Sequence, residues 1–157
     1  MPDPVRRYLA IDLGDKRTGL AGADSITRIA SPLRTIEILI AQRDRLLDAL
    51  AAAARDHEAT HLVLGLPINM DDSEGPRAKL ARAFALDLHQ RTNLPVHLHD
   101  ERLTSAQADW SMARSGMTHA QKKARRDALA AAALLHDFLS IDPAPPPDLP
   151  PAPPSES

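Results

Sequence analysis

The chain has 157 residues, which corresponds to about one domain, and its formal net charge of −2 at pH 7 is close to neutral, so any contact with nucleic acid must depend on a local group of basic residues. It contains no cysteine, which excludes a disulfide framework, thiolate catalysis and cysteine-ligated zinc. No apolar run approaches the roughly 20 residues that span a bilayer, so we expect a soluble, cytoplasmic protein without a membrane partner.

The first part of the chain is predicted to form three strands and a helix. The strands are expected over Arg7–Leu13, Thr18–Asp24 and Arg28–Glu37, and Gly19 in the second of them suggests a close backbone approach or a bulge. Apolar residues at helical spacing predict an amphipathic helix over Gln42–Asp56. Because three strands precede the first helix, we expect a mixed sheet covered by helices, an α/β fold, rather than an all-parallel sheet.

The middle of the chain continues the alternation of strands and helices. His61–Leu66 is predicted to be a buried strand, and the polar loop Pro67–Gly75 leads from it into a helix over Pro76–Arg91. Another strand is predicted for Pro95–Asp100, where His97 and His99 share one face, which is more often packed or solvated than metal-bound. Two further helices are predicted, over residues 104–115 and 118–139.

A proline-rich segment ends the chain. Eight of the 14 prolines lie between Pro143 and Pro154, and proline lacks a backbone donor and fixes φ. We therefore expect residues 140–157 to form a disordered or polyproline-like tail, solvated rather than held by a proline-binding partner. This leaves residues 1–139 as the folded domain.

Acidic residues lie at three places where a hydrophobic core would not be expected to hold them. Asp12 interrupts the first strand, Asp100 and Glu101 end a later strand and precede Arg102, and Asp127 lies in an alanine- and leucine-rich helical run. A carboxylate at a strand end is costly unless a cation or donors receive it, and two carboxylates about 4 Å apart repel by roughly 4 kcal/mol at an effective dielectric of 20. A cluster of the three favours a divalent ion between them, with Mg²⁺ or Mn²⁺ suited to oxygen ligands.

Each of these acids also has an ordinary structural interpretation, which the pattern alone leaves open. Asp12 could belong to a strand-to-turn connection, and Asp100 and Glu101 could form a surface ion pair with Arg102. Asp127 could pair with Lys123 on a solvated helix face. The polar loop before Arg77 could bind a phosphate at the following helix N-terminus or could be a plain connector.

Four stretches of the chain together resemble the YqgF family, also called RuvX, a family of pre-16S rRNA nucleases and Holliday junction resolvase-like proteins. They are LAIDLGDKRTGLAGAD, LVLGLPINMDDSEGPRAKLARAFA, LPVHLHDERLTSAQA and KKARRDALAAAALL, spread over about residues 8–139. The resemblance implies a ribonuclease H-like fold, a mixed five-stranded sheet with helices on both faces. Two positions depart from the family pattern, since Asp15 stands where a small hydroxyl residue is frequent and Asp72 where glycine is frequent, and both add negative charge near loops expected to bind phosphate.

The resemblance also implies a function for residues 1–139, that of a metal-dependent nuclease domain. Asp12, Glu101 and Asp127 would be its catalytic residues and would bind two Mg²⁺ or Mn²⁺ ions, with Asp12 between the ions. The implied substrate is RNA, in the maturation of the 5′ end of the 16S rRNA precursor, with ribosomal precursor particles as partners. Basic residues that could position phosphates are Lys16, Arg17, Arg77, Arg102, Lys122, Lys123, Arg125 and Arg126.

Alternatives of other kinds stay open from the sequence. A Holliday junction resolvase acting on branched DNA would favour a dimer with two sites. A non-catalytic nucleic-acid-binding module of the same fold could have lost its activity, although all three acids are present. A half-domain of a sugar-kinase-like or actin-like ATPase would share the glycine-containing hairpin, but such folds need a second domain to enclose the nucleotide.

Overall fold

The computed structural model describes residues 4–103, 119–141 and 144–151, with only the backbone of residues 103 and 119–124. The helix predicted over residues 104–115 lies outside the described residues. The elements in chain order are β1 (Arg7–Leu13), β2 (Thr18–Asp24), β3 (Ser31–Ile36), α1 (Arg43–Asp56), β4 (His61–Leu66), α2 (Pro76–Thr92), β5 (Val96–Asp100), a 3₁₀ turn (Glu101–Leu103) and α4 (His119–Leu139).

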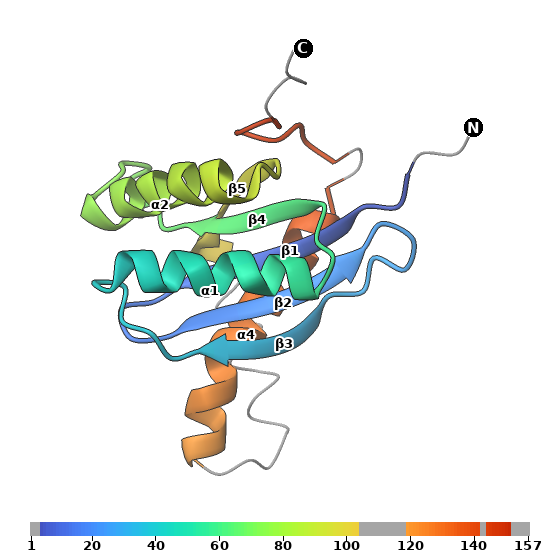
Figure 1. Ribbon diagram of the computed structural model, residues 1–157. Coiled ribbons are helices and arrows are strands. Elements are labelled where there is room, and N and C mark those ends of the chain that lie inside the picture. Colours follow the sequence, from blue (N-terminus) through green and yellow to red (C-terminus); the bar gives the residue numbers. More distant parts are fainter. Residues whose placement is uncertain (1–3, 104–118, 142–143, 152–157) are drawn as a thin grey trace.

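The five strands form one mixed sheet in the order β3-β2-β1-β4-β5 (Figure 1). β1 pairs antiparallel with β2 and parallel with β4, β4 pairs parallel with β5, and β2 pairs antiparallel with β3. The predicted mixed five-stranded sheet is confirmed. Its consequence for function is that the carboxyl ends of β1, β4 and β5 meet at one edge of the sheet.

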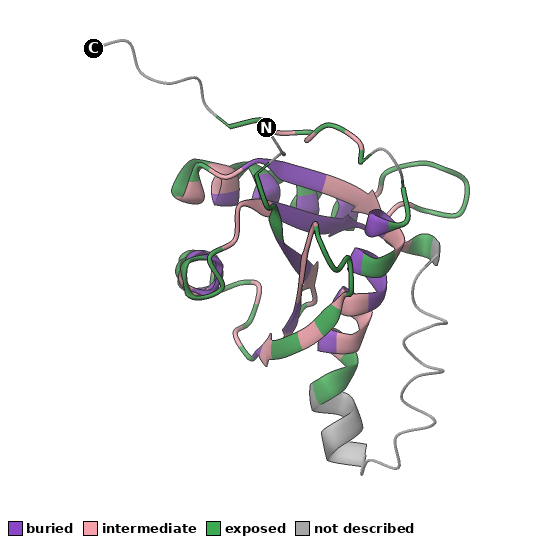
Figure 2. Ribbon diagram, turned by 90° about the vertical axis from the view of Figure 1, so that its right-hand side faces the viewer, coloured by how far each residue is buried: buried purple, intermediate pink, exposed green. Residues whose placement is uncertain are grey.

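Helices cover both faces of the sheet (Figures 1 and 2). α1 and α2 lie on one face, where large aliphatic side chains such as Leu9, Leu50 and Leu64 join Phe84 in the main hydrophobic core. α4 crosses the other face, where the small side chains of Ala10 and Ala21 lie in a buried cluster with Tyr8 and with Leu135 and Phe138 of α4. No helix in the described parts of the chain is long and apolar enough to cross a membrane.

The third strand is shorter than the predicted Arg28–Glu37, because a turn occupies the residues before it. The carboxylate of Asp24 accepts hydrogen bonds from the backbone N–H groups of Ile26 and Thr27, at 2.9 and 2.7 Å. Arg28 then adopts a left-handed backbone conformation, with φ of 55°. Side-chain bonds to nearby N–H groups favour turns over strand pairing, so β3 begins only at Ser31.

The described part of the proline-rich tail, residues 144–151, lies along the outer edge of β5. Leu149 and Val96 exchange two backbone hydrogen bonds, of 2.9 and 3.0 Å, and the carboxylate of Asp148 accepts the N–H of Leu98 at 2.7 Å. The Leu149 side chain also packs against the main core. Through these contacts the tail occupies donors and acceptors that an edge strand otherwise offers to another chain.

Candidate active site

Two of the predicted acids meet at the carboxyl ends of the parallel strands. Asp12 follows Tyr8 and Ala10 in the alternation of β1, so its side chain lies on the face covered by α4. The Glu101 carboxylate lies directly against Gly65, near the end of β4. A Cβ at Gly65 would overlap that carboxylate. A side chain at position 65 would therefore expel Glu101 from the site.

The side chains of Asp12 and Glu101 are hydrogen-bonded to each other. Burial is the largest cause that raises the pKa of Asp12, to about 9, and the hydrogen bond and negative charge of Glu101 raise it further. The positive charge of Arg77 acts in the opposite direction without cancelling these effects. In the absence of a cation, Asp12 therefore keeps its proton at neutral pH.

The third acid reaches this edge because α4 lies directly on β2. Asp12 is the register partner of Gly19, and a Cβ at Gly19 would overlap the backbone of Asp127. This is the close backbone approach predicted at Gly19. Burial first, and then the negative charge of Asp12, raise the pKa of Asp127. The side chain of Asp127 is only 27% exposed and lies 3.3 Å from the Nε of Arg17, so it faces the sheet.

The candidate phosphate-binding residues are distributed around the acids. Arg17 contacts Asp127, the positive charge of Arg126 lowers the pKa of Asp127, and Arg77 and Glu101 line a small hollow at the same edge. Arg102 directly follows Glu101 in the 3₁₀ turn. Lys16 is exposed in the β1–β2 turn and Arg125 is exposed on α4, whereas the side chains of residues 122 and 123 lie outside the described part of the chain.

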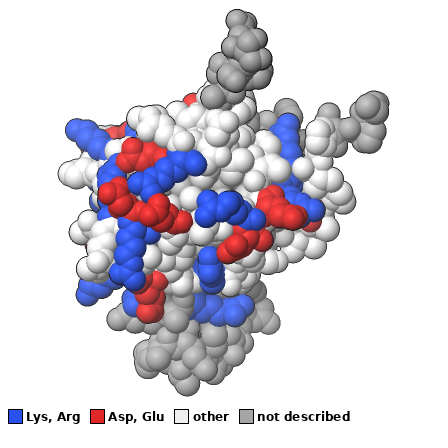
Figure 3. All heavy atoms as spheres, in the orientation of Figure 1, with Lys and Arg blue, Asp and Glu red and all other residues white. Residues whose placement is uncertain are grey.

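On the face that carries α1 and α2, the basic and acidic side chains of the described residues alternate and form no single basic surface (Figure 3). Three ion pairs account for part of this pattern, Arg43–Asp87, Arg82–Glu74 and Arg91–Asp44. This agrees with the expectation that any nucleic-acid contact depends on a local group of basic residues rather than on global charge.

The three acids fit a divalent cation by their chemistry. All of them offer carboxylate oxygens, the ligands that Mg²⁺ and Mn²⁺ prefer, and the pKa values of Asp12 and Asp127 are raised by neighbouring negative charge that a cation would neutralise. Within the described residues, no three acidic or histidine side chains already stand at the spacing of a closed metal site. Asp127 is instead engaged with Arg17.

The histidines of β5 have structural contacts, as expected. His97 is buried against Phe138, with their ring centroids 4.8 Å apart, and His99 lies 2.6 Å from a carboxylate oxygen of Asp137 near the end of α4. The His99 contact joins β5 to α4, so it helps to fix α4 across the sheet.

Gly65 was not predicted from the sequence to belong to the site, because its only signal was a glycine inside an otherwise apolar strand.

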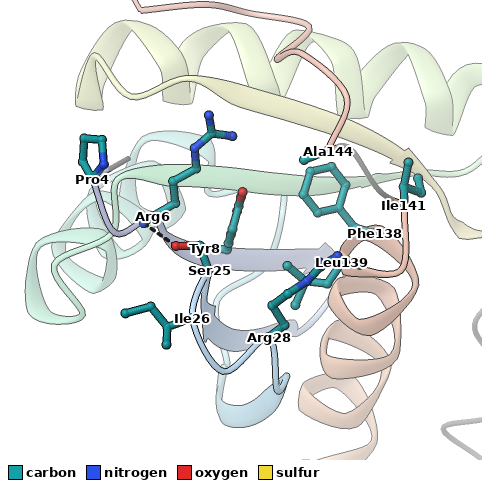
Figure 4. Close-up of a pocket in the computed structure, with 10 residues that line it drawn as sticks. All are labelled: Pro4, Arg6, Tyr8, Ser25, Ile26, Arg28, Phe138, Leu139, Ile141 and Ala144. Carbon is teal, nitrogen blue, oxygen red and sulfur yellow. Dashed lines mark hydrogen bonds between the residues drawn. The ribbon is translucent and has the colours of Figure 1, made fainter. Parts of the chain in front are cut away.

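A pocket of about 410 Å³ lies away from these acids, between the start of β1 and the end of α4 (Figure 4). Arg6, Tyr8 and Arg28 lie along its wall beside Phe138 and Ile141. Because no residue predicted for the catalytic site lines it, the pocket is not part of the candidate site.

The fold defines the class of protein. T. thermophilus RuvC in complex with a Holliday junction substrate has a TM-score of 0.54 and 11% identity to this chain, covering 84% of this chain and 92% of that chain. The Fowlpox virus resolvase in complex with Holliday junction DNA has a TM-score of 0.55 and 11% identity, covering 85% and 97%. The chain has a ribonuclease H-like fold, as the resemblance predicted.

Sequence similarity then gives the family within this class. The family described as "RuvX: Holliday junction resolvase" matches residues 6–141. A protein of Anaeromyxobacter sp. (strain K), named "Putative pre-16S rRNA nuclease", is 44% identical over 133 residues, which are 85% of this chain and 96% of that protein. A protein of the same name from Myxococcus xanthus (strain DK1622) is 39% identical over 133 residues, 85% and 87% of the two chains. The chain belongs to the RuvX family, whose description is that of a hydrolase acting on nucleic acid.

Proposed function

We propose that the chain is a metal-dependent nuclease that hydrolyses phosphodiester bonds in RNA, acting in the cytoplasm in the 5′ end maturation of the 16S rRNA precursor. The observation that carries this proposal is the convergence of three acids from distant parts of the sequence on one edge of the sheet, Asp12 from β1, Glu101 from the turn after β5 and Asp127 from α4. The names of the relatives support RNA as the substrate.

Asp12, Glu101 and Asp127 would hold Mg²⁺ or Mn²⁺ at this edge. When bound, the ions would supply an activated water and stabilise the leaving 3′ oxygen. The protein contributes the position of the three carboxylates, which Gly19 and Gly65 allow to approach one another. Near neutral pH the proton on Asp12 must leave before its carboxylate can ligate a cation, so cation binding releases a proton.

The basic residues would orient the substrate. Arg77 lies in the first turn of α2 and lines the same hollow as Glu101. The free N–H groups of this turn add hydrogen-bond donors for a phosphate. Arg102, in the turn after β5, and Lys16, in the turn between β1 and β2, add positive charge on two loops next to the acids. The basic residues between positions 122 and 126 would contact phosphates further along the nucleic-acid strand. We expect residues 1–139 to contain all groups needed for cleavage.

A cleavage assay with Mn²⁺ tests this proposal. The substrates are a 5′-extended 16S precursor RNA, a single-stranded RNA, a duplex DNA and a four-way DNA junction, and the proteins are the wild type, Asp12→Asn and Asp87→Asn. Asp87 of α2 pairs with Arg43 of α1, on the face of the sheet opposite that of the Asp12 side chain, so its amide variant is a matched control for the loss of one charge. We expect RNA cleavage by the wild type and by Asp87→Asn, and a loss of about 1,000-fold or more in Asp12→Asn.

A second candidate function is resolution of Holliday junctions, which the ribonuclease H-like fold shared with two junction-bound resolvases favours. A resolvase cuts two strands symmetrically, which favours a dimer with two sites. Paired cuts in the four-way junction alone, together with a dimeric mass by light scattering, would replace RNA cleavage with this function. Equal cleavage by the wild type and Asp12→Asn, or cleavage in excess EDTA, would contradict both functions.

A further inference from the structure

Two of the arginines at the candidate site are already paired with acidic side chains from the surrounding loops. Nη1 of Arg77 lies 3.1 Å from Oδ1 and 3.3 Å from Oδ2 of Asp15, in the turn between β1 and β2. Nη1 of Arg102 lies 2.7 Å from Oδ1 of Asp72, in the loop between β4 and α2. A guanidinium that binds a carboxylate in this way uses the same donors with which it would bind a phosphate.

Neither acid serves the hydrophobic core. The side chain of Asp15 is 69% exposed and that of Asp72 is 82% exposed. Asp72 also has φ of 69°, in the left-handed region that glycine adopts more readily, so the backbone does not favour an aspartate there. Among the described residues, the side chain of each acid is hydrogen-bonded to an arginine next to the candidate site, Asp15 to Arg77 and Asp72 to Arg102.

Both arginines are linked to the catalytic acids by independent observations. The positive charge of Arg77 lowers the pKa of Asp12, so it acts at the Asp12–Glu101 pair. Arg102 adjoins Glu101 in the chain and is held from its other side by Asp100, with Nη2 2.7 Å from Oδ2. The Asp100 contact fixes the arginine on its own turn, whereas the Asp72 contact spans two loops and occupies Nη1.

We propose that Asp15 and Asp72 compete with substrate phosphates for Arg77 and Arg102, and so set the affinity of this chain for nucleic acid and its dependence on salt. This inference rests on the proposed function, because it places two phosphates of the substrate at these arginines. Exposed ion pairs of this kind are weak enough for a phosphate to displace the carboxylate. The two acids thus tune binding without blocking the site.

Binding of a fluorescein-labelled 20-nucleotide single-stranded RNA, measured by anisotropy in EDTA, tests the proposal without cleavage. The variants are Asp15→Asn, Asp72→Asn and the double variant, which keep side-chain size and remove charge. Glu58→Gln is the matched control, because Glu58 is 75% exposed and pairs at 2.6 Å with Arg7 at the opposite end of β1. It removes the same charge from the protein without freeing an arginine at the site.

We expect each single variant to bind the RNA about two- to fivefold more tightly than the wild type, and the double variant about five- to twentyfold. The slope of log affinity against log salt should steepen by about 0.7 in Asp15→Asn, which frees Arg77, and by less in Asp72→Asn, because Arg102 stays paired with Asp100. Glu58→Gln should change the affinity by less than about twofold. Affinities and slopes of the site variants equal to those of Glu58→Gln would overturn the proposal.

A variant of Arg77 shows whether Asp15 acts by competing with phosphates for this arginine or by general repulsion of the RNA. In an Arg77→Gln background, Asp15→Asn should no longer tighten binding, because the donor for which the two acceptors compete is gone. An undiminished gain in that background would overturn the proposal as well. The binding assay and the cleavage assay can fail independently. If the site variants bind RNA more tightly but the wild type cleaves no substrate, the proposed cleavage is refuted and the competition for Arg77 and Arg102 still holds.

Discussion

The sheet presents mostly larger side chains to α1 and α2 than it presents to α4. The face under α1 and α2 buries large aliphatic groups, such as Leu9, Leu50 and Leu64, which supply most of the hydrophobic stabilisation. The face under α4 contains alanines and Gly19, and there the helix backbone lies directly on a strand. The face under α1 and α2 therefore mainly stabilises the fold, whereas the face under α4 sets the geometry of the site. Substitutions on the two faces should have different consequences.

A cavity on the aliphatic face should cost stability alone. Leu50 is fully buried in α1, and Leu50→Ala should lower the free energy of unfolding by about 3 kcal/mol, because packing contacts are lost and the void closes only in part. Urea denaturation measures this change. The cleavage rate per folded molecule should stay within about twofold of the wild type, and a tenfold lower rate would show that the two faces are not separate.

A single methyl group on the other face should disturb the site. In Gly19→Ala, the new Cβ would overlap the Asp127 backbone, which cannot rotate aside as a side chain can, so α4 must shift. We expect a loss of about 2 kcal/mol in unfolding free energy and at least a tenfold loss of cleavage per folded molecule. Gly22→Ala in the same strand is the control, because its Cβ would meet only the end of the Leu33 side chain, at 3.1 Å. Equal effects of the two variants would refute the role of Gly19.

The crowded carboxyl groups should make stability depend on pH. Asp12 keeps its proton up to about pH 9 in the folded protein but loses it near pH 4 when unfolded, so the folded state holds one proton more between these values. The free energy of unfolding therefore falls as pH rises through this window. Asp12→Asn lacks this dependence and should be more stable than the wild type by on the order of 2 kcal/mol at pH 8.5 in EDTA, and similar to it near pH 4. A difference independent of pH would contradict the assignment.

The smallest expected effect concerns His97, which is buried under α4 with both ring nitrogens unpartnered. Burial lowers the pKa of His97 to about 4, so between pH 6.5 and 4 the unfolded chain holds a proton that the folded protein does not. Stability should fall as pH falls through that window. His97→Leu should raise the unfolding free energy by about 1 kcal/mol at pH 7 and by more at pH 5. Destabilisation at both pH values would show that the imidazole has a partner.

Much of the fold could be predicted from local patterns. The bounds of β1, β2 and β4 agree with the predicted strands, because each is a short apolar run that ends at a polar residue or a proline. The third strand was predicted too long, since the hydrogen bonds of the Asp24 carboxylate depend on a turn that the run of residues after Asp24 does not reveal. The contact of Leu149 with Val96 depends on a free sheet edge, which the tail sequence alone cannot show.

The three acids of the proposed site could be picked out from the sequence, but their arrangement in space could not. Asp12 interrupts an apolar strand, Glu101 follows a strand end and Asp127 lies in an alanine- and leucine-rich helix. The reason they can approach one another was only half visible, because Gly19 stood out and Gly65 did not. The pairing of Asp15 with Arg77 joins residues 62 positions apart, so it follows from the sheet topology and not from spacing.

The most direct test of the central claim is Mn²⁺ binding by isothermal titration calorimetry at pH 8, without nucleic acid. The proteins are the wild type, Asp12→Asn, Glu101→Gln and Asp127→Asn, with Asp87→Asn as the control. If the three acids form one metal site, each of the three amide variants should bind Mn²⁺ at least about tenfold more weakly than the wild type and the control. Wild-type affinity in Asp127→Asn would remove α4 from the site, and wild-type affinity in all three would contradict the account.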